Sequence, residues 1–173
     1  MHHQIRLLLV PCSLRISLSV VLVATFSNNA FSLEYRADLG LLIGRWLQAL
    51  PPLQLQGAYE AMLAAAKAYN NCRFWLLDLR RRPMAGLDFN EWFREQFSPQ
   101  IASALGGPLF TAYLAVPHQR LAAESAEMEL HLRHAATLDL YPLLYDGEAE
   151  AVTWLTDQQE RAGVRQAEKS HTG

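Results

Sequence analysis

Two continuous apolar runs constrain the fold of this chain more than any other feature. The first is 74–79 (FWLLDL), which is apolar except for Asp78, and the second is 109–116 (LFTAYLAV). Runs of this kind are typical of strands covered on both faces, as in a parallel sheet. We expect the two runs to lie side by side and to point the same way. Parallel neighbours need a crossover connection, usually a helix, so the runs predict an α/β protein.

The segments around these runs supply the other elements of the same architecture. Residues 31–36 alternate apolar and polar side chains, residues 37–40 are a turn, and residues 41–47 (LLIGRWL) are a second strand, so an antiparallel hairpin comes first. The other expected elements are helices over 53–69, from Asp88 (as N-cap) to Gly106, over 119–136 and over 147–159, and a strand over 141–145. The order predicts a mixed β-sheet with parallel later strands and helices packed on it.

Composition and charge exclude several classes of protein. The 173 residues are 51% hydrophobic and 18% charged, which excludes a disordered chain, and the length suits one domain. A net charge of −2 removes the usual electrostatic case for binding nucleic acid. The two cysteines, Cys12 and Cys72, cannot make a disulfide framework or a four-cysteine zinc site.

The N-terminal head differs in composition from the rest of the chain. Residues 1–32 hold two arginines and no acidic residue, and 16–26 (ISLSVVLVATF) is an apolar run. The run is shorter than the roughly 20 apolar residues of a membrane span, but it suits a secretory signal. Alternatively, residues 17–25 form an edge strand, or the head is an extension from a misplaced start codon. The expected location is cytoplasmic, or exported if residues 1–32 are a signal peptide.

The expected organisation of the chain therefore has three parts. Residues 1–30 are an N-terminal extension, residues 31–159 are one α/β domain, and residues 160–173 are a polar, frayed C-terminal tail.

A loop rich in arginine follows the first apolar run. Asp78 is followed by Arg80, Arg81 and Arg82, just before a predicted helix. Ligands of open α/β sheets bind beyond the carboxyl ends of parallel strands, and arginine binds phosphate or carboxylate through paired hydrogen bonds. The loop therefore predicts an anion pocket or an acidic docking patch. The alternative is a solvated loop in which one arginine pairs with Asp78 and another with Glu91.

Aromatic residues are concentrated in the helix after this loop. Phe89, Trp92, Phe93 and Phe97 recur at helical spacing. One interpretation is an apolar pocket or lid for a lipid-like ligand, to which Phe89 and Trp92 contribute. The alternative is core packing, because aromatics at this spacing face one way and bury a large area.

Signals for catalysis or metal binding are weak. Glu127, His131 and His134 share one face of a predicted helix, but an exposed acidic helix explains them without a metal. Acid–base catalysis by Asp78 needs a second titratable group in the same cleft, and the sequence shows none near it. No P-loop or glycine-rich dinucleotide motif occurs. We therefore predict no catalytic residues, no metal and no cofactor.

Several short segments stand in a particular order along the chain. They are LEYRADLGLLIGRWL (33–47), AYEA (58–61), NNCRFWLLDLRRR (70–82), LGGP (105–108) before AYLAVP (112–117), and DGEAEA (146–151) before Trp154. By their order and spacing, residues 31–159 resemble the SpoIIAA-like, STAS-related family of small bacterial proteins. The resemblance implies a STAS-like fold. STAS domains are non-enzymatic switches in sigma-factor control or in anion transporters, and some relatives look like CRAL-TRIO lipid-binding domains.

The phosphorylation site of the STAS domains in sigma-factor control is missing from this chain. Their phosphorylated serine lies in the loop after the Asp-ending strand, and residues 78–86 contain no serine or threonine. No phosphorylation site is therefore carried over from the resemblance.

These observations predict a non-enzymatic, STAS-like regulatory or binding module. It would act through protein–protein contact, or by binding a small anionic or lipid-like ligand, and a homodimer is an alternative assembly. The alternatives are a small enzyme that uses Asp78 beside an arginine-lined anion site, and an exported envelope protein. The predicted binding residues are Asp78, Arg80, Arg81, Arg82, Phe89 and Trp92.

Overall fold

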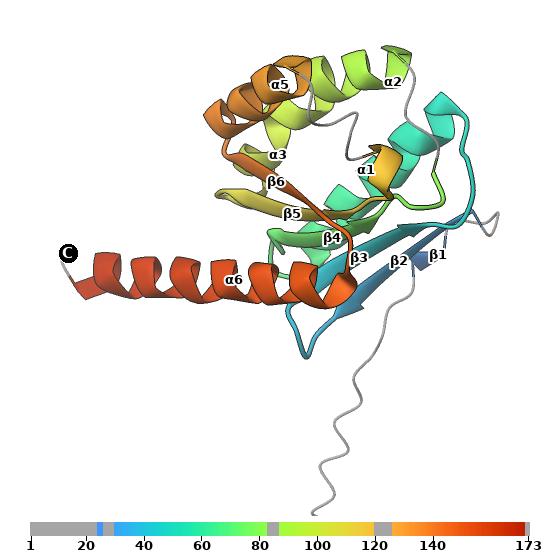
Figure 1. Cartoon of the computed structure of the whole chain (residues 1–173). Coiled ribbons are helices and arrows are strands. Elements are labelled where there is room, and N and C mark those ends of the chain that lie inside the picture. The colour runs from blue at the N-terminus through green and yellow to red at the C-terminus, as the bar shows by residue number, and fades with distance from the viewer. Residues whose placement is uncertain (1–23, 26–29, 83–86, 120–125, 172–173) are drawn as a thin grey trace, which may run out of the picture.

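The computed structural model describes residues 24–25, 30–82, 87–119 and 126–171. Within these residues, one six-stranded sheet has the order β1-β2-β3-β4-β5-β6 (Figure 1). The strands are β1 (Ala24–Thr25), β2 (Phe31–Arg36), β3 (Leu41–Trp46), β4 (Phe74–Asp78), β5 (Leu109–Leu114) and β6 (Leu140–Tyr145). Strands β1 to β3 pair antiparallel, whereas β3 to β6 pair parallel. The predicted mixed α/β sheet is therefore confirmed, including the adjacent parallel strands β4 and β5.

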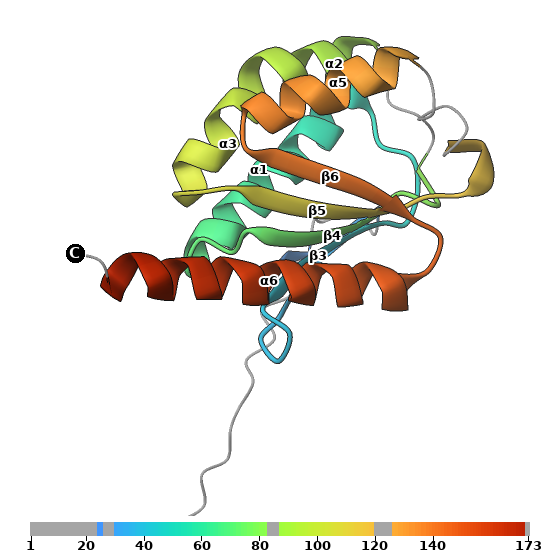
Figure 2. The same ribbon diagram turned by 60° about the vertical axis from the view of Figure 1, so that its left-hand side comes forward.

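Helices cover the two faces of the sheet unequally (Figures 1 and 2). One face carries α1, α2, α3 and α5, and on the other face α6 is the one helix that the described residues supply. A π-helical turn, η1, joins α2 to α3, and residues 117–119 are also helical. The helices are α1 (Pro52–Ala68), α2 (Leu87–Trp92), η1 (Phe93–Phe97), α3 (Ser98–Leu105), α5 (Ala126–Thr137) and α6 (Glu148–His171).

Each central strand contributes to two separate cores, which explains why its sequence does not alternate. Successive side chains point to opposite faces, so in β4 Trp75 and Leu77 join the core under α1, while Leu76 joins the core under α6. The smaller core is closed by two fully buried residues of α6, Ala151 and Leu155. The sheet residues of this core are Leu41, Ile43, Leu76, Phe110, Ala112 and Leu114.

Several local signals place the helix ends. Pro52 stands in the first turn of α1, where its missing N–H costs nothing. Asn70 and Asn71 follow that helix with φ of 53° and 55°, a conformation that asparagine tolerates better than most residues. Gly106 ends α3 with φ of 71°, the left-handed geometry for which glycine is preferred.

The helix after the arginine loop differs from its prediction in two ways. Helix α2 begins at Leu87, so Asp88 lies inside the first turn and is not the N-cap. The single predicted helix is also divided into α2, η1 and α3, and Pro99 lies in the first turn of α3, which begins at Ser98. Pro99 cannot donate to a carbonyl in the preceding turn, and η1 accommodates it by widening that turn.

The two ends of the chain also differ from expectation. Helix α6 continues to His171, so most of the expected tail 160–173 is helical. Of the alternatives for the head, an edge strand is found at Ala24–Thr25, which pairs with β2. Residues 1–23 and 26–29, which include Cys12 and most of the predicted signal, lie outside the described residues. The predicted helix 119–136 is found as α5, and residues 120–125 also lie outside them.

Candidate functional site

Asp78 and Arg45 lie side by side at the carboxyl ends of β4 and β3. The parallel register of the two strands pairs Arg45 directly with Asp78. Both side chains are on the face that α6 covers, because each is an even number of residues from a buried side chain of that core, Ile43 or Leu76. A charged residue inside the apolar run LLIGRWL thus has a specific neighbour in the next strand.

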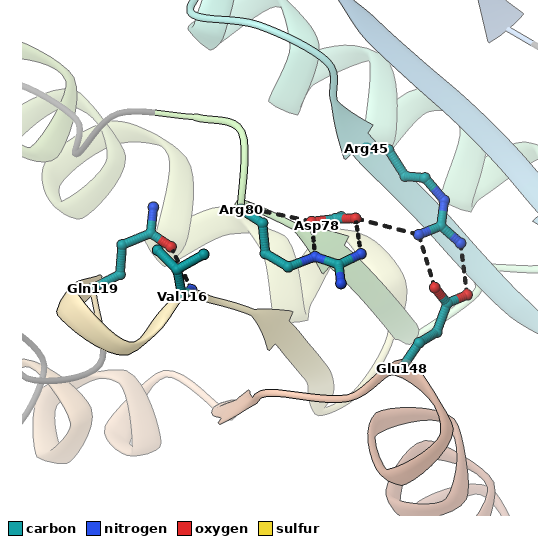
Figure 3. Close-up of polar contacts among 6 residues, drawn as sticks. All are labelled: Arg45, Asp78, Arg80, Val116, Gln119 and Glu148. Carbon is teal, nitrogen blue, oxygen red and sulfur yellow. Dashed lines mark hydrogen bonds and ion pairs between the residues drawn. The ribbon is translucent and has the colours of Figure 1, made fainter.

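Asp78 is the centre of a hydrogen-bonded network (Figure 3). Its Oδ1 accepts from the backbone N–H of Arg80 at 3.1 Å and from Arg80 Nε at 2.9 Å, and its Oδ2 accepts from Arg80 Nη2 at 2.7 Å. Arg45 Nη1 lies 3.4 Å from the same Oδ2. Arg45 also donates twice to Glu148, at 3.0 and 2.6 Å, which ties the first turn of α6 to the sheet.

The electrostatics of this network favour ionised carboxylates. Burial alone would raise the pKa of Asp78, but the hydrogen bonds and charge of Arg80, with the charge of Arg45, lower it below its ordinary value. The hydrogen bonds from Arg45 lower the pKa of Glu148 despite its partial burial. A general acid at neutral pH needs a raised pKa, so the arrangement suits charge pairing better than proton transfer.

Gln119 joins the described part of the arginine loop to the residues that follow β5. This side chain is buried, and its Nε2 donates to the carbonyls of Leu79 and Arg82 at 3.2 and 2.9 Å. Its Oε1 accepts from the backbone N–H of Val116 at 3.0 Å (Figure 3). Loop and strand end are therefore fixed relative to each other.

The network borders an open hollow of about 470 Å³ at this edge of the sheet. Arg80 and Arg81 are exposed there, as the position beyond a parallel strand predicts. The residues that line the hollow are Arg45, Trp46, Leu47, Asp78, Arg80 and Arg81.

Arg82 does not join the other predicted arginines. Its Nη1 lies 3.5 Å from the Tyr59 hydroxyl, and its guanidinium carbon lies 5.2 Å from the ring centroid of Trp46 and 5.6 Å from that of Phe89. The structure thus divides the predicted cluster. Asp78, Arg80 and Arg81 face the open hollow, whereas Arg82 and Phe89 belong to an aromatic interior. None of the ion pairs among the described residues joins this loop to Glu91, although the expected pairing of Asp78 with an arginine is present.

The aromatic residues of α2 and η1 pack around Tyr59 of α1. Phe89, Phe93 and Phe97 lie 5.4 to 5.7 Å from the Tyr59 ring, centroid to centroid. Trp92 is half-buried and stacks on Phe97 at 5.0 Å. Core packing therefore describes most of this set. The packing leaves a small apolar hollow of about 50 Å³, lined in part by Tyr59, Phe93 and Tyr113.

Three contributors to the site are absent from the sequence prediction: Arg45, Gln119 and Glu148. The signals for them were an arginine at a polar position within an apolar strand, a glutamine after Pro117, and an acidic first turn of the last helix. Each contacts a residue at least 33 positions away, so no local pattern pairs them.

Two further features bear on the predicted classes. In the part of the chain that the structure describes, no three His, Cys, Asp or Glu side chains gather as a metal site would require, and no helix has the length and apolarity to cross a membrane. The side chains of Glu127 and His131 lie outside the described ones.

Comparison with known proteins yields no match: no protein-family model, curated protein or solved structure is significantly similar to this chain.

Proposed function

We propose that this protein is a non-enzymatic, STAS-like binding module that recognises an anionic group at the open hollow beyond β3 and β4. The observation that carries the proposal is the charge balance of the hollow. Three arginines, 45, 80 and 81, meet two carboxylates, of Asp78 and Glu148, and Arg81 takes part in none of the ion pairs among the described residues. The exposed positive charge of Arg81 is thus left over beside a hydrogen-bonded frame.

The frame itself supports binding over catalysis. Asp78 and Glu148 orient Arg80 and Arg45, and Gln119 holds the loop backbone, so little ordering entropy opposes the docking of a ligand. Carboxylate and phosphate are the groups that arginine binds best. The ligand would be a small anion or an acidic segment of a partner protein. The enzyme alternative is less well supported, because both carboxylates have lowered pKa values.

Titration followed by NMR tests this proposal. Inorganic phosphate and a hexaglutamate peptide would be added in separate arms, and the backbone amides of Leu47 and Arg81 would report binding at the hollow. For whichever of the two probes binds, we expect Arg81→Ala to weaken its affinity by roughly tenfold or more, which is the effect of losing a charged hydrogen bond. The matched control is Arg161→Ala, which removes the same charge from an exposed position on α6. Equal losses in the two variants would show a nonspecific charge effect and would overturn the site.

The exported envelope role and the homodimer stay predictions.

A further inference from the structure

An exposed leucine lines the same open hollow as the arginines. Leu47 follows β3 directly, its side chain is 42% exposed, and it lines the hollow together with Arg80 and Arg81. Its backbone N–H donates to the Ala30 carbonyl at 2.8 Å, which fixes its position. Single exposed leucines are common on protein surfaces. Among the large apolar side chains that are exposed in the described residues, however, Leu47 alone lines this hollow, so an apolar contact lies in the same hollow as the charge of Arg81.

The apolar wall beside Leu47 is supported from below. Trp46 also lines the hollow, although it is only 1% exposed, because it belongs to the core under α1. Its ring packs 4.9 Å from the Phe31 ring and 5.4 Å from the Tyr59 ring, centroid to centroid. A ligand that packs on Leu47 therefore meets a wall that is already ordered, and the binding loses little free energy to the ordering of side chains.

The size and charge of the hollow favour a ligand larger than an inorganic ion. Its volume of about 470 Å³ lies within the range of roughly 300–1,000 Å³ that is typical of sites for organic ligands. A phosphate ion would leave most of that space to water. The three arginines and two carboxylates of the network leave one positive charge over, which a single carboxylate matches and a phosphate dianion exceeds. The hollow therefore suits one carboxylate that is attached to a larger body.

We propose that the open hollow recognises an acidic segment of a partner protein in which an apolar side chain adjoins the carboxylate. This ligand class rests on the proposed function and names the partner of that same site. The carboxylate accepts hydrogen bonds from Arg81, and the apolar side chain packs on Leu47. The open form of the hollow favours a segment that crosses it, because sites for small molecules enclose most of the surface of the ligand. A free inorganic anion makes only the charged half of this contact.

Peptides of equal length separate the charge from the apolar contact. ELELE and EAEAE, each acetylated and amidated, carry the same charge, whereas QLQLQ keeps the leucines and lacks the charge. In titrations followed by NMR at the Arg81 amide, we expect ELELE to bind roughly fivefold or more tightly than EAEAE, because a partly buried leucine side chain leaves water. QLQLQ should bind at least about tenfold more weakly than ELELE, because it makes no charged hydrogen bond. If ELELE has the same affinity as either of the other peptides, the proposal is overturned.

Two alanine variants locate the apolar contact. Leu47→Ala should reduce the preference for ELELE over EAEAE to about twofold or less, because it removes the surface on which the leucine packs. Leu143→Ala is the matched control, since Leu143 is 45% exposed on the edge strand β6 and does not line the hollow. The control should keep the full preference. A preference that survives in Leu47→Ala, or that is lost equally in Leu143→Ala, would refute the contact with Leu47.

The same titrations distinguish a failure of this inference from a failure of the proposed function. If ELELE and EAEAE bind equally and Arg81→Ala weakens both, the hollow is an anion site and only the apolar preference is refuted. The same conclusion follows if phosphate binds through Arg81 and neither peptide does. If Arg81→Ala weakens the binding of no probe, the proposed function fails together with this inference.

Discussion

Asp78 accepts hydrogen bonds from two arginines while its side chain is only 13% exposed, so its ionised form belongs to the folded state. Because its pKa is lowered on folding, it contributes stability above its unfolded pKa of about 3.9 and loses this contribution as the pH falls through the folded value. The same sign applies to Glu148. Acid therefore weakens the link between the sheet and α6.

Replacing Asp78 by Asn tests this account of the edge. We expect Asp78→Asn to destabilise the protein by about 1–3 kcal/mol at neutral pH, because two arginines lose a charged acceptor. The difference from the unmodified protein should shrink below about pH 4, where Asp78 itself becomes protonated. Urea unfolding at both pH values measures the effect. Asp38→Asn is the control, because Asp38 is 62% exposed; an equal loss there would contradict a special role for Asp78.

Gln119 supports a second prediction about the loop. Gln119→Met keeps the length of the side chain but leaves the Leu79 and Arg82 carbonyls and the Val116 N–H without their partner. A loss of about 1–3 kcal/mol follows for such buried groups. Hydrogen exchange should accelerate at the Arg82 amide, which donates to Leu79 O. Gln100→Met, on an exposed position, is the control. An unchanged exchange rate at the Arg82 amide would show that the loop keeps its conformation without the hydrogen bonds of Gln119.

The sequence predicted where the site lies, at the carboxyl end of β4, but not which side chains pair with one another there. Asp78 and Arg80 are two residues apart, so their pairing could be inferred locally. The partnership of Arg45 with Asp78 depends on the register of β3 against β4, and that with Glu148 on the path of α6. The inward turn of Arg82 depends on aromatic rings from three different elements, α1, α2 and β3. Neither a window of sequence nor a motif contains that information.

At the scale of elements, burial on both faces made the central strands predictable. The strand β4 at 74–78 and β5 at 109–114 stop one or two residues short of the predicted runs. The end of α6 was not predictable by the same reasoning, because apolar periodicity stops near Leu155. Residues 160–171 are mostly good helix formers such as Ala, Arg, Gln, Glu and Lys, so intrinsic propensity extends the helix where packing no longer requires it.

A glycine substitution tests whether α6 continues past Gln159. Gly163 is exposed within the helix, and an added Cβ would meet no atom within 4 Å. If the helix persists, Gly163→Ala should stabilise the protein by up to about 1 kcal/mol, the difference in helix propensity. Thermal unfolding and helical circular dichroism measure the change. Gly44→Ala is the opposite case, because its Cβ would lie 3.1 Å from Leu77 Cδ2, and it should destabilise. No gain from Gly163→Ala would indicate a frayed segment.

At the scale of the whole molecule, the two cores depend on different amounts of the chain. In the described structure, α1, α2, α3 and α5 together cover one face of the sheet, whereas α6 alone covers the other face (Figure 2). Both ends of the packed part of α6 are fastened: Glu148 pairs with Arg45, and Gln159 Nε2 donates to the carbonyls of Leu39 and Gly40, each at 3.0 Å. The helix therefore crosses the sheet from the carboxyl edge to the β2–β3 turn.

Truncation separates the packed part of α6 from its extension. A chain ending at residue 163 keeps Leu155 and Gln159 and should fold with nearly full stability. A chain ending at residue 146 exposes the core of Leu41, Ile43 and Leu76, and we expect it to aggregate or unfold. Losing Leu155 alone would cost about 2–5 kcal/mol, against a total of about 5–15 kcal/mol for a domain, so losing the whole helix exceeds what the fold can tolerate. Size-exclusion chromatography with thermal unfolding compares the two. A monomeric, cooperatively folded 1–146 chain would mean that α6 is an accessory to a sheet that needs only one covered face.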